Sequence, residues 1–315
     1  MRKFIVLGIA KNIENQCQIL FNCLTAILDQ REGSLAFIYE DGSTDKTPEL
    51  LAKISETDKR IVVKSDKSSG APTTALTWDN KPCRLERIAF ARNKCMEMWE
   101  NTYKDDAVVI WLDTDRVHLV DGPVIHQVAE QLMGVPAEVA SAFFAMSLNH
   151  QGQMYDTFAY RSEKNALGPE IMGEEWWSKE NQNKIHQEVN ECSGPSLQVL
   201  SACNGLAMYK SECIRGLRFS ALPTEQVEKY HRQIFRDSKH PCHKKLLELQ
   251  DKPKTHHEGV CIGRYCFGTE GMWYKNNSGY NQPVVCEWLS FHYAMRDRGF
   301  KGLFIIKPWM DISGH

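Results

Sequence analysis

Residues 107–115 read Ala107-Val108-Val109-Ile110-Trp111-Leu112-Asp113-Thr114-Asp115, an unbroken apolar run that ends in two carboxylates. A run of this length bounded by polar residues predicts a strand that is buried on both faces. Two carboxylates separated by one residue at a strand end can converge on a hard cation such as Mn²⁺ or Mg²⁺, which then bridges phosphate oxygens of a nucleotide. Asp113 and Asp115 are therefore candidate metal ligands, and the alternative is a chance Asp-x-Asp in a solvated loop.

Four further apolar runs occur in the first 150 residues and alternate with segments of helical period. The order strand, helix, strand predicts an α/β fold whose parallel sheet is covered on both faces and takes ligands at the carboxyl ends of its strands. The predicted strands are residues 4–10, 35–39, 61–63, 107–112 and 139–146, and the predicted helices are residues 15–30, 48–55, 84–99 and a segment after Pro123.

The periodicity is weaker beyond residue 150. Residues 162–196 are polar, residues 223–255 predict helix, residues 285–298 predict a helix ended by Gly299, and residues 303–306 predict a last strand. Because no segment has the composition of a flexible linker, we expect one continuous body whose second half, residues 151–315, adds to the sheet of residues 1–150.

Composition excludes several classes of protein. The 315 residues carry 38 Lys and Arg against 40 Asp and Glu, a net charge of −2, which argues against nucleic acid or an anionic membrane as the main partner. The 11 cysteines are odd in number and do not follow the spacing of disulfide scaffolds, so we expect reduced thiols and a cytoplasmic location. No run approaches the roughly 18 apolar residues that a transmembrane helix needs. The short apolar run after Met1-Arg2-Lys3 favours a first strand over a signal peptide.

A second acidic cluster, residues 40–45, directly follows the predicted strand 35–39. Its carboxylates can accept hydrogen bonds from a base N–H or from ribose hydroxyls, which makes Asp41 and Asp45 candidate nucleotide ligands. The alternative is a turn that caps the next helix, because Asp and Ser are good N-caps and Pro48 suits a first helical turn.

The two acidic clusters each close a strand, and in this pairing the chain resembles the GT-A glycosyltransferases. Their nucleotide-sugar domain uses an acidic residue after an early strand for the base and a later Asp-x-Asp for the metal and the diphosphate. Residues 10–15 resemble the first nucleotide-binding loop of that superfamily, and residues 39–47 resemble its family-2 members. The resemblance implies that Asp41 contacts the base, and that Asp113 and Asp115 contact the ribose-diphosphate and the metal.

The order of four short motifs resembles the fungal capsule-associated α-1,3-mannosyltransferases more closely. The motifs are residues 84–94, the Asp-x-Asp, residues 155–161 and Cys203-Asn204-Gly205. Fungal Golgi mannan polymerase subunits share the Arg-Asn helix and the acidic strand end. The resemblance, which covers residues 4–220 and 285–308, implies a GT-A (Rossmann-like) fold with a mixed, mostly parallel sheet flanked by helices. Residues 1–150 would be the nucleotide-sugar-binding half, and residues 151–315 the acceptor-binding and catalytic half.

Basic side chains on the predicted helix 84–99 suit a diphosphate, because guanidinium groups form paired hydrogen bonds with phosphate oxygens. We expect at least one of Arg87, Arg92 and Asn93 to contact the diphosphate or the sugar of the donor. The alternative is surface pairing of the arginines with Glu86 and Glu97. Further along the chain, Asn204 and Gly205 end a plausible strand, where glycine would permit close approach by a sugar; the alternative is a bulge.

Glu287 opens the predicted helix 285–298, where many inverting enzymes of the GT-A fold keep a general base. Asp156 is the second candidate for that role, and the alternative for Glu287 is a carboxylate that stabilises a helix N-terminus. His315 could complete the metal site, as a late histidine does in several GT-A enzymes, although terminal residues are often poorly ordered. The His and Cys residues in the last third of the chain do not have the spacing that zinc ligands usually show. Some of Trp176, Trp177, Trp273, Tyr274 and Trp288 could stack on sugar rings.

These observations predict a glycosyltransferase that depends on Mn²⁺ or Mg²⁺ and moves a sugar from a UDP- or GDP-sugar to a hydroxyl of a glycan or glycoconjugate. The stereochemical outcome is open, since the fungal resemblance favours retention and a base at Glu287 favours inversion. Two alternatives are a nucleotidyltransferase and a catalytically silent module that binds a glycan or a protein. Residues 11–14 lack the Gly-rich, basic loop usual in nucleotidyltransferases.

Overall fold

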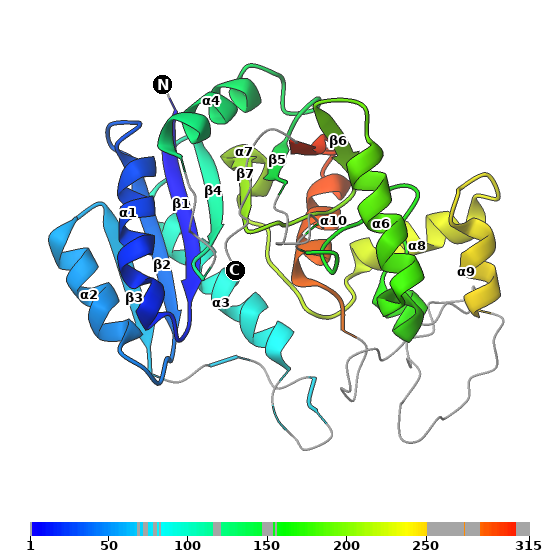
Figure 1. The fold of residues 1–315 in the computed structure, drawn as a ribbon, viewed down its shortest axis with the longest axis horizontal. Helices are drawn as coiled ribbons and strands as arrows, with labels where there is room; N and C mark the ends of the chain where they lie inside the picture. The colour runs from blue at the N-terminus through cyan, green and yellow to red at the C-terminus, as the bar shows by residue number, and fades with distance from the viewer. Residues whose placement is uncertain are drawn as a thin grey trace.

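The computed structural model describes residues 2–67, 70–71, 75–77, 81, 83–115, 121–146, 154, 156–250, 274 and 284–306. Their main elements form one eight-stranded sheet with helices on both faces (Figure 1). The strands are β1 (Lys3–Ala10), β2 (Leu35–Asp41), β3 (Ile61–Asp66), β4 (Ala107–Asp113), β5 (Ala142–Ala145), β6 (Ser196–Val199), β7 (Leu206–Lys210) and β8 (Leu303–Ile306).

The α-helices are α1 (Cys17–Leu28), α2 (Thr47–Thr57), α3 (Arg84–Thr102), α4 (Gly122–Met133), α5 (Pro169–Met172), α6 (Lys179–Glu191), α7 (Ser211–Ile214), α8 (Glu225–Arg236), α9 (His243–Gln250) and α10 (Glu287–Asp297). Two short 3₁₀ helices, η1 (Glu14–Gln16) and η2 (Gly173–Trp177), complete the described elements. None of the helices that the structure describes has both the length and the apolar stretch needed to cross a bilayer.

The strand order is β3-β2-β1-β4-β7-β5-β8-β6. β1, β2, β3 and β4 pair in parallel, β7 runs antiparallel between β4 and β5, β8 pairs in parallel with β5, and β6 is antiparallel to β8. The predicted α/β class, with a mixed, mostly parallel sheet between helices, is confirmed. The two halves of the chain share this sheet, because β7, β6 and β8 come from residues beyond 150 (Figure 1).

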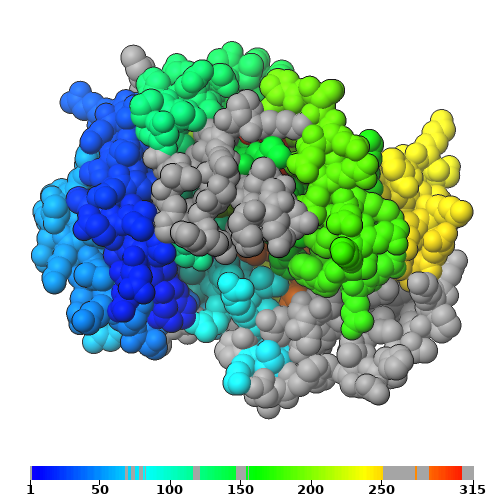
Figure 2. Space-filling view, viewed as in Figure 1, coloured from blue at the N-terminus to red at the C-terminus, as the bar shows by residue number. Residues whose placement is uncertain are grey.

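Alternate residues of the central strands enter two separate hydrophobic clusters, which explains why these strands are apolar throughout. In β1, Phe4 and Val6 pack with α1, α2 and α4 on one face of the sheet. Ile5 and Leu7 pack on the other face with α3, α10 and much of the second half. Figure 2 shows the elements of residues 2–66 and those of α6 and α9 at opposite ends of one face of the molecule.

Most predicted elements of the first half are present with small shifts, and the second half differs more. The segment 139–146 yields only the short strand β5, because residues before it form turns. The polar segment 162–196 contains α5, η2, α6 and the start of β6, none of which was predicted. The expected helix 223–255 is two helices, α8 and α9, separated by turns at residues 238–242, and residues 251–255 lie outside the described part of the chain. The prediction of β8 is confirmed at residues 303–306.

Candidate functional site

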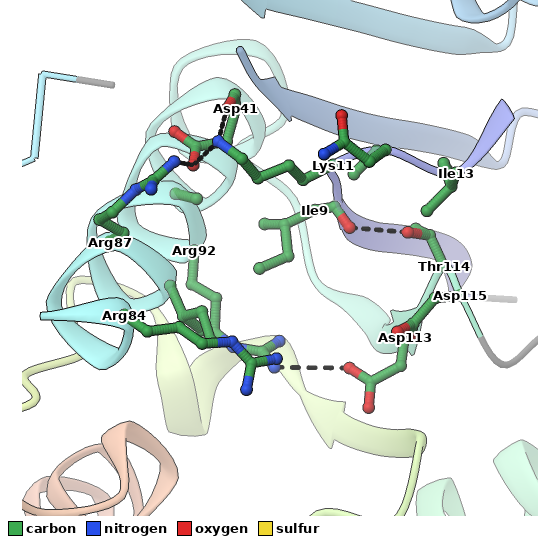
Figure 3. A pocket seen from close by; sticks show the side chains of 14 residues that line it. Ile9, Lys11, Ile13, Asp41, Arg84, Arg87, Arg92, Asp113, Thr114 and Asp115 are labelled. Carbon is green, nitrogen blue, oxygen red and sulfur yellow. Dashed lines mark hydrogen bonds and ion pairs between the residues drawn. The ribbon is translucent and has the colours of Figure 1, made fainter. Parts of the chain in front are cut away.

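A pocket of about 470 Å³ opens at the carboxyl ends of β1, β2 and β4. The sheet register brings these ends together, since Ile9 lies opposite Asp113 and Ala10 lies opposite Glu40. The loop after β1, the first turns of α3 and the turn after β4 form the walls (Figure 3). The lining residues are Ile9, Ala10, Lys11, Asn12, Ile13, Asp41, Arg84, Arg87, Ile88, Ala91, Arg92, Asp113, Thr114 and Asp115.

Asp41 lies in this pocket at the end of β2 and is only 6% exposed. Its Oδ2 atom accepts from Lys11 Nζ and from Arg87 Nη2, each at 3.3 Å (Figure 3). Its Oδ1 atom is buried and has no hydrogen-bond partner among the described residues. A buried carboxylate oxygen without a partner is costly, and this atom is available to accept a further hydrogen bond.

The loops that follow β1 and β2 hold each other in place. The backbone N–H of Asn12 donates to Ser43 Oγ at 2.8 Å, and Asn12 Oδ1 accepts from the backbone N–H of Thr44 at 2.8 Å. Asn12 has a φ of 53°, a left-handed conformation that asparagine tolerates better than most residues. This side of the pocket is therefore formed before any ligand binds.

Asp45 also holds these two loops together, and it does not form part of the pocket wall. Its Oδ1 atom accepts from the backbone N–H of Thr47 at 3.0 Å and its Oδ2 atom from that of Glu14 at 3.2 Å. Desolvation raises the pKa of Asp45, but these hydrogen bonds outweigh it and the net shift is downward. Both oxygens hold the loop at the start of α2, as the capping alternative expects, and contact of Asp45 with the nucleotide stays a prediction.

The turn after β4 places Asp113 and Asp115 on the opposite wall from Asp41 (Figure 3). The backbone N–H of Asp113 donates to the carbonyl of Gly205 at 2.8 Å, and Thr114 Oγ1 donates to the carbonyl of Ile9 at 2.7 Å. Gly205 has a φ of 83°, which glycine adopts readily. The Asp-x-Asp turn is thus fixed by β1 on one side and by the chain leading into β7 on the other.

The donor set of this turn fits a hard divalent cation. No group of three or more His, Cys, Asp or Glu side chains able to hold a metal occurs in the part of the chain that the structure describes. Two carboxylates are enough where substrate phosphates complete the shell, which is how Mg²⁺ and similar cations usually bind. Asp113 and Asp115 would hold the cation against the pocket. His315 lies outside the described residues.

Arg92 links the carboxylate of Asp113 to the start of α10. Its Nη2 atom lies 3.4 Å from Asp113 Oδ1, and its Nε atom lies 3.2 Å from Glu287 Oε1. The guanidinium is 5% exposed and lies over the ring of Trp288, 4.4 Å from the centroid. Burial lowers the pKa of Arg92, but attraction to Glu287 and Asp113 outweighs it, so the net shift is upward. Arg92 is therefore a fixed positive charge between two carboxylates.

A second pocket of about 440 Å³ adjoins the first, and both are lined by Arg84, Ile88, Arg92 and Asp113. Glu287 and Asp156, the two predicted candidates for the general base, both line this second pocket.

Asp156 in this second pocket sits in a tight turn, with its Oδ1 atom accepting from the backbone N–H groups of Phe158 and Ala159 at 3.0 and 3.1 Å. Burial raises the pKa of Asp156 to about 7, and the negative charges of Glu287 and Asp113 add to the shift, against the hydrogen bonds that lower it. A carboxyl group that titrates near neutrality can exchange a proton with a substrate hydroxyl.

Two predicted ligands instead hold the chain together. The Asn93 amide donates to the carbonyl of Phe219 at 3.0 Å and accepts from its N–H at 2.8 Å, so it clamps α3 to the segment before α8 and lines neither pocket. Asn204 is buried, donates to the carbonyl of Ala145 and precedes β7 rather than ending a strand. Contact of Asn93 and Asn204 with a ligand stays a prediction, since both side chains are engaged within the protein.

The alternative for the arginines of α3, surface pairing with glutamates, is wrong for Arg87 and Arg92, which pair with Asp41, Asp113 and Glu287. Glu97 pairs with Lys94 instead, and Glu86 is buried and accepts from the backbone N–H of Ala75. Sequence reasoning missed the role of Lys11, whose ammonium lies beside Asp41. A lysine directly after the first strand was the available signal.

Comparison with solved structures gives weak similarities. The mannosyltransferase PcManGT from Pyrobaculum calidifontis, in complex with GDP-Man and Mn²⁺, is 13% identical at a TM-score of 0.41, covering 70% of this chain and 48% of that one. TarS 1–349 of S. aureus is 13% identical at 0.40, covering 69% and 50%. Glucosyl-3-phosphoglycerate synthase from Mycobacterium tuberculosis, with Mn²⁺, UDP and glucosyl-3-phosphoglycerate, is 15% identical at 0.39, covering 72% and 62%. The chain spans about half the length of the first two, and similarities of this strength assign no substrate.

The family comparison is more decisive. No curated protein matches the chain significantly. The model of the family described as Cryptococcal mannosyltransferase 1 matches residues 9–244, which is well over half of the chain and includes Asp41, α3 and the Asp-x-Asp turn. The resemblance to fungal mannosyltransferases is thereby confirmed. This chain belongs to the Cryptococcal mannosyltransferase 1 family of glycosyltransferases.

Proposed function

We propose that the protein is a metal-dependent glycosyltransferase that takes a sugar from a nucleoside diphosphate sugar and attaches it to a hydroxyl of a glycan or glycoconjugate. The observation that carries this proposal is the pocket at the carboxyl ends of β1, β2 and β4. It has the unpartnered Oδ1 atom of Asp41 on one wall and the carboxylates of Asp113 and Asp115 on the other. Its volume of about 470 Å³ suits a small organic ligand.

The charges of the pocket match the parts of such a donor. Asp41 Oδ1 can accept from a base N–H or a ribose hydroxyl, with Lys11 beside it. Arg84 and Arg87 line the pocket between the two acidic walls and can bind phosphate oxygens. Asp113 and Asp115 would hold Mn²⁺ or Mg²⁺, which when bound neutralises charge on the departing diphosphate. Arg92, already paired with Asp113 and Glu287, keeps the metal-side carboxylate in place.

The second pocket would receive the acceptor. In the transfer, the acceptor oxygen forms a bond to the anomeric carbon, and the bond from that carbon to the diphosphate oxygen breaks. The nucleoside diphosphate leaves with the electron pair of the broken bond. The proton of the acceptor hydroxyl passes to a carboxylate, for which Asp156 and Glu287 are the candidates because both line this pocket. Asp156 is favoured because burial raises its pKa to about 7, whereas Glu287 is held by the guanidinium of Arg92.

A donor panel tests the proposal. Mn²⁺ is titrated with UDP- and GDP-sugars, starting with those of mannose, while thermal unfolding and donor hydrolysis are followed. A true donor raises the free energy of unfolding by about 2.7 kcal/mol at 100 times its Kd, only when metal is present. Asp115→Ala should abolish both the stabilisation and the turnover. Asp105→Asn, an exposed change near the opposite end of β4, should leave them intact.

The same panel separates the alternatives. A silent binding module would show no metal-dependent stabilisation by any nucleotide sugar. A nucleotidyltransferase would release pyrophosphate from a nucleoside triphosphate, so the panel also includes UTP and GTP with a sugar 1-phosphate. A glycosyltransferase instead releases a nucleoside diphosphate from the nucleotide sugar. Unchanged activity of the Asp115→Ala variant would refute the metal role of the Asp-x-Asp turn. The anomeric configuration of the product, read by NMR, then decides between retention and inversion.

For the cellular location we propose a reducing compartment such as the cytoplasm. The support is that seven cysteines of the described part of the chain are buried free thiols, namely Cys17, Cys23, Cys95, Cys203, Cys213, Cys242 and Cys286. Alkylation of the protein taken directly from its host cells, followed by intact-mass analysis, should label every thiol once the protein is unfolded. Thiols that resist labelling until a reductant is added would contradict the proposal.

A further inference from the structure

The second pocket has an aromatic rim whose exposure the fold does not explain. Trp177 is 50% exposed, whereas Trp99, Trp111, Trp176 and Trp288 are buried. Its ring is stacked on that of Phe158, with centroids 5.9 Å apart and planes 19° from parallel. Both rings line the pocket that holds Asp156 and Glu287. A large apolar ring left in water beside hydrogen-bonding groups is typical of a ligand site rather than of a core.

Buried interactions fix both partners of this stack. Arg161, which is fully buried, donates from Nη1 to the carbonyls of Phe158 and Tyr160 at 2.9 and 2.7 Å. Its guanidinium also lies over the ring of Trp176, 4.8 Å from the centroid. One side chain therefore contacts the segment that carries Phe158 and the residue next to Trp177.

Further contacts hold the arginine and the tryptophan segment. Arg161 Nη2 lies 3.0 Å from Glu170 Oε2. The carbonyl of Trp176 accepts from the side chains of Asn181 and Gln182 at 2.9 and 2.6 Å. The exposed ring of Trp177 is thus presented by a rigid support, which reduces the entropy lost when a ligand packs on it.

We propose that the Trp177–Phe158 stack is the platform on which the acceptor sugar ring lies, with Trp177 as a specificity-determining residue. This inference rests on the proposed function. The apolar face of a pyranose ring packs on the indole, and its hydroxyls donate to the carboxylates of Asp156 and Glu287, which accept hydrogen bonds. The platform thereby points one hydroxyl of the acceptor sugar toward the first pocket, which would hold the donor. The two pockets share Asp113 and Arg92.

The polar groups of the pocket also define the class of acceptor. Three carboxylates, of Asp113, Asp156 and Glu287, line it together with two cations, of Arg84 and Arg92, and Arg92 is already paired with two of the carboxylates. The hydroxyl groups of a sugar find hydrogen-bond acceptors in these carboxylates. The platform therefore accepts an uncharged pyranoside.

The test measures glycoside binding directly, by saturation-transfer NMR with the methyl pyranosides of mannose, glucose and galactose as probes. At least one should bind the wild-type protein. Trp177→Ala should weaken binding roughly tenfold, the loss expected for one aromatic contact of about 1.4 kcal/mol, and Trp177→Phe should restore most of it. Val139→Ala, which changes an apolar residue that is 59% exposed and lines neither described pocket, is the matched control.

Kinetics distinguish a platform from a merely structural residue. With the best donor, Trp177→Ala should raise the KM for the glycoside roughly tenfold, a much larger change than that in kcat, whereas the control Val139→Ala should change neither. The platform is overturned if no glycoside binds or if Trp177→Ala binds the glycosides as the wild type does. If glycosides bind through Trp177 but no nucleotide sugar stabilises the protein, the proposed function fails while the platform stands.

Discussion

At the scale of single residues, Arg92 is the side chain on which the charges of the site depend. It is buried among aromatic rings and separates two carboxylates, Asp113 and Glu287, that would otherwise repel each other. Removing one partner of a buried ion pair leaves an uncompensated charge, which costs more than the pair itself contributes. The position thus combines a structural and a functional role, and its replacement should damage both.

Arg92→Met should lower the free energy of unfolding by about 3–5 kcal/mol, because two carboxylates lose their counter-charge. It should also abolish metal-dependent donor binding. Lys94→Met is the control on the same helix, since Lys94 pairs with Glu97 where both side chains are partly exposed, and it should cost under about 1 kcal/mol. Urea unfolding checks both values, and equal losses for the two variants would contradict the role given to Arg92.

Asp156 makes stability depend on pH. Its pKa is about 7 in the folded protein against 3.8 for the unperturbed group, so between these values the folded state keeps a proton that the unfolded chain has lost. The free energy of unfolding should therefore fall as pH rises from about 4 to about 7, by up to about 4 kcal/mol, and then level off.

Asp156→Asn removes this dependence, because the amide does not titrate and its oxygen can still accept from Phe158 and Ala159. Urea titrations at pH 5 and pH 8, in EDTA to exclude metal, should show a larger loss for the wild type than for the variant. Parallel pH dependence of the two proteins would mean that Asp156 titrates in its ordinary range.

At the scale of elements, the segment from residue 156 to α6 is organised by a buried ion pair. Arg161 and Glu170 are both fully buried, and Gly168 lies so close that a Cβ atom there would be 1.7 Å from Arg161 Nη2. Burying two charges costs free energy, and hydrogen bonds from Arg161 to backbone carbonyls offset part of that cost. The polar composition of residues 162–196 is therefore compatible with a densely packed segment.

The pair predicts strong coupling between two substitutions. Arg161→Met alone should lower the free energy of unfolding by about 3–5 kcal/mol, since it leaves Glu170 buried without its main partner. Adding Glu170→Leu should recover part of that loss. A double-mutant cycle in urea should therefore give an interaction energy above about 1 kcal/mol, and simple additivity would show that the two charges do not depend on each other.

The elements also show what the sequence could predict. Long apolar runs such as 4–10 and 107–112 predicted β1 and β4, because a strand buried on both faces leaves no alternative to continuous hydrophobicity. Asp41 and Asp113 were predicted as site residues because they end such strands, and both line the first pocket. α6 was missed because only Asn181, Ile185 and Val189 of its residues are buried, too few to give a clear period. Asp45 and Asn93 were assigned to the ligand because a hydrogen-bonding side chain has the same residue type whether it binds a loop or a substrate.

At the scale of the whole molecule, the sheet joins the two halves of the chain. β7 lies between β4 and β5, so residues 206–210 complete the sheet begun by residues 1–150. The cluster containing Ile5 and Trp111 also includes Trp288 and Phe291 of α10. The division at residue 150 is therefore a functional proposal, donor side and acceptor side, within one folding unit.

This arrangement predicts cooperative unfolding. The full chain should unfold in a single urea transition that is the same by fluorescence and by circular dichroism. Residues 1–150 expressed alone should fail to fold, because β4 and one face of the sheet would lose their cover. Two separate transitions, or a stable 1–150 fragment, would show that the halves are independent domains.

The central claim is that Asp113 and Asp115 hold a divalent cation against the diphosphate of a nucleotide whose base side lies at Asp41. A crystal structure of the protein with Mn²⁺ and a nucleoside diphosphate tests it most directly. The account predicts metal density in contact with the Asp-x-Asp turn and with phosphate oxygens, and a nucleoside hydrogen-bonded to Asp41 Oδ1. A nucleotide bound elsewhere, or a metal held away from these carboxylates, would contradict it.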